Sequence, residues 1–212
     1  DEFSSWLEQI RRSQKTGEPV NVPCGGCSAC CISSYFIHIK PCETGTIAKI
    51  PKELMFPAPG LPAGNVLLGY NKKGHCPMFI GCKCSIYKYR PETCRTYDCR
   101  IFTATGMQPD DDKVLISRQV NRWKFKFENG RDLKEFSAVR AAARFINEHA
   151  ESFPEGFIPV NSPQRALVAI KVYKVFLDHA YENEKETVLK PDQKIIKAVI
   201  DSYKNFENNM DI

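Results

Sequence analysis

Residues 24–31 read Cys24-Gly25-Gly26-Cys27-Ser28-Ala29-Cys30-Cys31, and half of this run is cysteine. Gaps of two residues allow neighbouring cysteine sulfurs to converge on one metal centre. Gly25 and Gly26 permit the tight backbone that such wrapping requires. The run therefore predicts metal or iron–sulfur ligation, and the alternatives are catalytic thiols, disulfides or simple packing.

The order of the cysteines differs from the bacterial ferredoxin motif C-x2-C-x2-C-x3-C-P, because Cys31 follows Cys30 directly and no proline comes next. Adjacent side chains diverge in a helix and in a strand, so we expect Cys30 and Cys31 to have different roles. A helix that begins near Cys24 would place Cys24, Cys27 and Cys31 on one face. Cys30 would then reach a second ligand set or pack.

The remaining composition is that of an ordinary globular protein. The chain has 212 residues, of which 42% are hydrophobic and 26% charged, enough to bury a core. All ten cysteines lie between Cys24 and Cys99, and residues 100–212 contain none. Because a chain of this length does not need disulfides to fold, this distribution indicates a local site.

Positive charge is concentrated around the later cysteines. Residues 71–106 carry seven basic and two acidic residues, a net charge of +5 that equals the net charge of the whole chain. Nearby cations lower the pKa of thiols and offset the charge of thiolates. A solvated basic surface and a nucleic-acid patch are the other interpretations, although nucleic acid is not an expected partner.

The second cysteine block, residues 75–99, contains Cys76, Cys84, Cys94 and Cys99. Their spacings of eight, ten and five residues are too irregular for a zinc ribbon. The block could still close a four-sulfur site across a turn and a helix.

Together the two blocks resemble the YkgJ-type cysteine-cluster family, described as zinc- or iron-chelating domains or Fe–S-cluster oxidoreductases. The resemblance covers about residues 24–100 and includes Cys76-Pro77 and Arg90-Pro91. It implies eight metal ligands: Cys24, Cys27, Cys30, Cys31, Cys76, Cys84, Cys94 and Cys99. Cys42 and Cys82 lie outside the motif. A relative with a similar cluster is the flagellin lysine methylase, which implies a methyltransferase as one alternative.

Three further side chains lie close to the second block. Arg90 and Arg95 flank Cys94 and could donate hydrogen bonds to sulfur, bind an anion or form surface ion pairs. Tyr87 could cover the site or belong to the core. Farther along, Arg140 and Arg144 are four residues apart and could hold an anion or form a solvated stripe.

The hydrophobic pattern predicts an α+β fold, with a small cysteine-rich half packed against a mainly helical C-terminal half. We expect a cysteine-cluster region over residues 1–106 and a helical region over 107–212, together forming one compact unit. Helices are expected over residues 5–13, 44–50, 91–97, 133–146, 162–176 and 196–206. Strands are expected over 35–40, 66–70, 78–80, 85–87 and 123–127, with a loop over 51–64.

The expected cofactor is a 4Fe-4S cluster or, as the alternative, zinc. The function would be redox or group transfer on a protein or small molecule, a non-catalytic zinc-stapled binding or metal-buffering module, or an Fe–S-dependent protein lysine methylase. Dinucleotide, P-loop and zincin motifs are absent from the sequence. With no apolar stretch long enough for a membrane span and no export signal, we expect a cytoplasmic protein.

Overall fold

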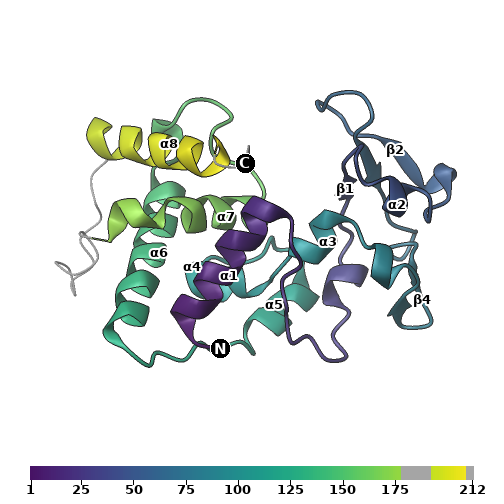
Figure 1. The fold of residues 1–212 in the computed structure, drawn as a ribbon, viewed down its shortest axis with the longest axis horizontal. Coiled ribbons are helices and arrows are strands. Elements are labelled where there is room, and N and C mark those ends of the chain that lie inside the picture. The colour runs from purple at the N-terminus through teal and green to yellow at the C-terminus, as the bar shows by residue number, and fades with distance from the viewer. Residues whose placement is uncertain (178–191, 209–212) are drawn as a thin grey trace. The chain divides into compact units, whose positions relative to one another are not determined.

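The computed structural model describes residues 1–177 and 192–208, which divide into two compact units (Figure 1). The helical unit comprises Asp1–Thr16, Cys99–Asp111 and Val120–Ile212, and the cysteine unit comprises Gly17–Asp98 and Asp112–Gln119. The chain thus enters the helical unit, leaves it and returns, whereas we expected one boundary after residue 106. Helix α1 (Phe3–Thr16) accounts for much of the difference, because its apolar residues are buried within the helical unit.

Helices build the core of the helical unit, where α6 (Gly130–Glu148) contacts both α1 and α7 (Ser162–Val172). Helix α4 (Arg100–Thr105) also packs on α6 and α7, and α8 (Gln193–Asn208) packs on α7. Short 3-10 turns follow α6 and α7, at Ala150–Ser152 and Tyr173–Phe176. Helix α5 (Val114–Val120) belongs to the cysteine unit except for its last residue, Val120.

The predicted strand over residues 123–127 is wrong. This segment makes one isolated parallel bridge, between Glu2 and Lys126, and no strand. The ring of Phe125 instead packs against those of Phe3 and Trp6, with centroids 5.0 and 4.8 Å apart. Its alternating pattern therefore reflects packing on α1, which itself begins at Phe3, two residues before the predicted start.

The Asn129-Gly130 pair begins a helix, although the sequence suggested a turn that ends a strand. Asn129 caps α6: its side chain accepts a hydrogen bond from the Asp132 N–H, and the Asp132 carboxylate accepts one from the Asn129 N–H. This reciprocal pair satisfies two N–H groups that a helix end leaves without partners.

The cysteine unit contains two small antiparallel sheets. Strands β1 (Ile37–Ile39) and β2 (Met55–Pro57) flank β3 (Val66–Leu68), and β4 (Phe79–Ile80) pairs with β5 (Lys83–Cys84). Strand β2 lies inside the predicted loop over 51–64. The predicted strand over 85–87 is also wrong: β5 ends at Cys84, only the Ser85 N–H still bonds back to the Met78 carbonyl, and a 3-10 turn covers Tyr87–Tyr89.

The helices of this unit are short. They are α2 (Thr44–Ile47), α3 (Glu92–Thr96), most of α5, and two further 3-10 turns at Ala29–Ile32 and Lys52–Leu54. A helix from Cys24 is not formed, so the shared face expected for Cys24, Cys27 and Cys31 does not arise from helical spacing. The α+β class predicted from the sequence is confirmed.

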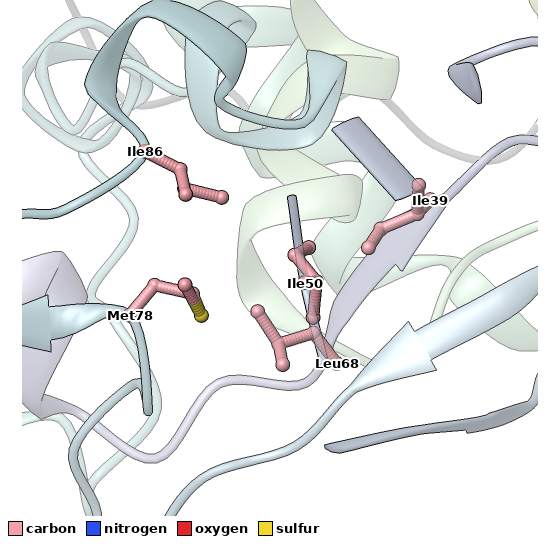
Figure 2. Close-up of a cluster of buried hydrophobic side chains, with 5 residues drawn as sticks. All are labelled: Ile39, Ile50, Leu68, Met78 and Ile86. Atoms are coloured by element: carbon pink, nitrogen blue, oxygen red, sulfur yellow. The ribbon is translucent and has the colours of Figure 1, made fainter. Parts of the chain in front are cut away.

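Five apolar side chains form a buried cluster in the cysteine unit (Figure 2): Ile39, Ile50, Leu68, Met78 and Ile86. They come from β1, β3 and the segments beside α2, β4 and β5. Cys76 and Cys84 are partly buried against this cluster. The core of the unit therefore continues into the cysteine site. Among residues 1–177 and 192–208, no helix has the length and apolarity to cross a membrane.

Candidate metal centre

Backbone hydrogen bonds place three cysteines from distant parts of the sequence. Cys31 lies on the 3-10 turn Ala29–Ile32, and its carbonyl accepts a 2.7 Å hydrogen bond from the Cys76 N–H. Two residues after Cys76, Met78 accepts a hydrogen bond from the Ser85 N–H, next to Cys84. Antiparallel pairing of Cys84 with Phe79 then closes the β4–β5 hairpin.

Helix α3 carries the fourth cysteine, Cys94, and polar contacts attach this helix to β1 and α2. The Thr93 hydroxyl donates to the carbonyl of His38 at 2.8 Å. The Glu43 carboxylate, which precedes α2, accepts a 2.6 Å hydrogen bond from the Glu92 N–H. Lys40 completes the attachment with a 2.7 Å ion pair to Glu92. The short helix is therefore positioned by contacts about fifty residues distant in sequence.

The thiols of Cys31, Cys76, Cys84 and Cys94 lie close enough to interact electrostatically. Burial, and then the charges of Cys76, Cys31 and Cys84, raise the pKa of Cys94 to about 12 against the lowering effect of Arg90. Burial, and then the charges of Cys76 and Cys84, likewise raise the pKa of Cys31 to about 11. Arg90 again opposes the shift.

Cys76 has direct hydrogen-bond donors. Burial raises the pKa of its thiol, while the backbone N–H groups of Met78 and Phe79 lower it by donating hydrogen bonds to the sulfur. Such donors stabilise a thiolate and tune a metal centre that it ligates. Cys84 raises the pKa of Cys76 as it does for Cys31 and Cys94.

This donor set suits a bound metal. Four partly buried thiolates close to one another would repel one another. A bound metal cation or cluster would offset that repulsion, and the thiols would lose their protons on binding it. Across residues 1–177 and 192–208, no three His, Cys, Asp or Glu side chains are arranged at the ligand spacing of a single metal ion. All ten cysteines are free thiols.

The first cysteine block is only partly joined to this set. Cys27 raises the pKa of Cys31, and its N–H donates to the Cys24 carbonyl in a tight turn at 3.0 Å. Gly25 has a φ of +56° in that turn, a conformation that favours glycine. Cys24 is half-buried, and Cys30 is exposed. The divergence predicted for Cys30 and Cys31 thus matches their different burial.

Cys99 belongs to the helical unit, where it precedes α4 and is buried. Its sulfur accepts a 3.1 Å hydrogen bond from the indole Nε1–H of Trp123, which lies in the same unit. The sequence assigned Cys99 to the second ligand block; the structure gives it this separate polar partner.

Arg90 and Arg95 have different environments. The Arg90 guanidinium lies over the ring of Tyr87, 3.7 Å from its centroid, and its charge lowers the pKa of Cys31 and Cys94. Arg95 donates to the Arg90 carbonyl and lies 3.8 Å from the Glu43 carboxylate. Arg95 thus helps to hold the backbone at Arg90 in position. Tyr87 is 65% exposed, so it is not a core residue.

The two cysteines outside the motif are both exposed. Cys82 lies in the β4–β5 turn with a φ of +59°, and Cys42 follows β1. Neither thiol is among the charges that shift the pKa of Cys31, Cys76 or Cys94. Glu43 is the residue that sequence reasoning missed, since only long-range contacts reveal that it positions α3.

Comparison with known proteins agrees with this site. Residues 23–114 match the CxxCxxCC family model, described as a "putative zinc- or iron-chelating domain". The match spans all ten cysteines. No curated protein and no solved structure matches the chain.

Proposed function

We propose that this chain, whose residues 23–114 match a zinc- or iron-chelating family model, holds one iron–sulfur cluster through four cysteines: Cys31, Cys76, Cys84 and Cys94. The observation that carries the proposal is the convergence of these four cysteines: backbone hydrogen bonds join the Cys31, Cys76 and Cys84 segments, and the charges of these three thiols raise the pKa of Cys94. The proposal reduces the eight ligands expected from the sequence to four. Cys27 is linked to this set only by its effect on the pKa of Cys31.

The origin of the four thiols supports a cluster over zinc. Structural zinc sites usually take their ligands in pairs separated by two to four residues, as in zinc ribbons. Here each cysteine comes from its own segment: a 3-10 turn, a loop, a hairpin strand and helix α3. All four donors are sulfur, the donor type that holds [4Fe–4S] clusters.

Neighbouring groups would stabilise the charge of such a centre. The N–H groups of Met78 and Phe79 donate to the Cys76 sulfur, and Arg90 supplies a positive charge. Hydrogen bonds to sulfur and solvent exposure set the reduction potential of a cluster. When bound, the cluster would supply one-electron transfer or an open iron position.

Zinc is the second candidate, because the matching family model is described as zinc- or iron-chelating. Five buried side chains form the apolar cluster of the cysteine unit, so a metal staple of either kind would complete the fold. Oxidoreduction and protein lysine methylation would each need a substrate site beside the centre. The features described above support chelation alone.

Metal analysis of anaerobically purified protein distinguishes the candidates. We expect iron and acid-labile sulfide with a broad absorption band near ~400 nm, as for thiolate-ligated iron clusters. Colourless protein with one zinc per chain would overturn the cluster and leave the zinc staple. Protein without either metal after anaerobic purification would overturn both.

A further inference from the structure

The helical unit contains a cavity of about 370 Å³ whose lining includes three arginines. Arg140 and Arg144 project from α6, and Arg165 projects from α7. Apolar lining comes from Met107 and Ala143, and none of the residues that line the cavity is acidic. The volume lies in the range of small-molecule sites, well above that of a single ion.

Neutral groups hold Arg165 in place. Its Nη1 donates to the Asn147 Oδ1 at 2.9 Å, and its Nε donates to the Pro159 carbonyl at 3.1 Å. A third, 3.3 Å hydrogen bond joins Nη2 to the Val160 carbonyl. These acceptors orient the guanidinium without neutralising its charge.

Arg140 is likewise held by neutral groups. It lies over the Phe136 ring, 4.7 Å from the centroid, and donates a 3.4 Å hydrogen bond to the Thr103 carbonyl. Burial, and then the charge of Arg144, lower the pKa of Arg140. The like charges of α6 therefore repel each other across one helical turn, and a bound anion would relieve that repulsion.

The carboxylate of Asp110 is engaged by Ser162, a residue that lines the cavity. Asp110 accepts hydrogen bonds from the Ser162 hydroxyl at 2.5 Å and from the Ser162 N–H at 3.3 Å, at the start of α7. The Asn161 side chain caps the same helix by accepting from the Gln164 N–H. Protein groups thus bond to the first turn of α7, and the guanidiniums are the charged groups of the cavity lining.

We propose that this cavity binds a small molecule through a phosphate group. Three guanidiniums from two helices suit a tetrahedral dianion with three free oxygens better than the two coplanar oxygens of a carboxylate. A concave surface lined by one sign of charge concentrates the opposite ion. The volume beyond a single phosphate accommodates the rest of a phosphomonoester.

Calorimetric titration of the full-length protein with inorganic phosphate tests this proposal, with succinate and chloride at equal ionic strength as comparison anions. We expect saturable binding of phosphate that is tighter than that of succinate. Arg144→Gln should weaken phosphate binding about tenfold, the effect of losing a hydrogen bond to a charged group. Arg122→Gln removes the same charge from an exposed position of the helical unit outside the cavity lining, and should change nothing.

Three outcomes would overturn the proposal. The first is the absence of saturable binding at phosphate concentrations up to about 10 mM, because a dissociation constant above that concentration would be too weak for a binding site. The second is equal weakening by Arg122→Gln, which would indicate attraction by net charge alone. The third is tighter binding of succinate, which would identify a carboxylate site. Circular dichroism of each variant verifies that it is folded.

Discussion

The two units of this protein bury side chains of very different size. The helical unit encloses large side chains that are almost completely buried, including Phe3, Trp6, Phe102 and Phe176. The cysteine unit has five aliphatic side chains in its buried cluster, and two of its cysteines pack against them. Small cores rarely stabilise a fold without a metal or disulfides. The difference indicates that the helical unit is held by apolar burial and the cysteine unit by ligation.

Metal removal should therefore produce the largest difference between the two units, because it should unfold the cysteine unit and leave the helical unit folded. Binding energies of structural metal sites are on the order of 10 kcal/mol, and this energy is folding energy. We expect chelation under anaerobic conditions to abolish slow amide exchange in residues 17–98 while α1, α6 and α7 stay protected. Hydrogen exchange followed by mass spectrometry measures this. Equal loss of protection in both units would break the comparison.

A substitution that leaves a cavity in the helical core should destabilise the helical unit and leave the metal content unchanged. Phe176 is fully buried and packs on Phe145, with ring centroids 5.5 Å apart. Phe176→Ala should lower the free energy of unfolding of the helical unit by about 3–5 kcal/mol. Denaturant titration measures the change, and elemental analysis should find the same metal content as in the unchanged protein. A variant that loses its metal would show that the units depend on each other.

The smallest effect concerns alkaline pH and Tyr173 in the helical unit. Burial, and then the charge of Glu135, which accepts its 3.2 Å hydrogen bond, raise the pKa of this phenol to about 12 against the lowering effect of Arg11. Because the folded pKa lies above the unfolded value near 10, the contribution is complete below about pH 10 and is lost as the pH rises through about 12.

Tyr173→Phe isolates that contribution. Between pH 10 and 12, the free energy of unfolding should fall further in the unchanged protein than in the variant. The difference between the two losses should be at most about 1 kcal/mol. The thiols ionise in both proteins, so their effect cancels in the difference. Parallel pH profiles of the two proteins would show that the phenol is not coupled to folding.

Local signals in the sequence predicted much of the fold. The three-to-four-residue spacing of apolar side chains located α6, α7 and α8. The cysteine spacing predicted a metal site in the region that matches the chelating family model. The pattern failed at residues 123–127, where Phe125 alternates with charged residues because it packs on Phe3 and Trp6 of α1. Alternation with a period of two indicates that every second side chain is buried. A strand has this property, and so does an extended segment that packs across a helix.

The candidate ligand set could not be reduced from the sequence. Spacing grouped Cys99 with Cys94, but the indole of Trp123 supplies a partner for Cys99 within the helical unit. Cys31 and Cys76 are neighbours only because a backbone hydrogen bond joins segments 45 residues apart. Glu43 likewise acts on α3 from a distance. Each of these relations depends on tertiary contacts, which sequence spacing does not encode.

The metal content of single serine variants tests the central claim most directly. Iron, acid-labile sulfide and zinc are measured for Cys31→Ser, Cys76→Ser, Cys84→Ser and Cys94→Ser, with Cys42→Ser and Cys82→Ser as matched controls on exposed thiols. The account predicts that each of the first four loses most of its metal and that both controls retain it. Full metal content in any of the first four, or equal loss in the controls, would contradict the account.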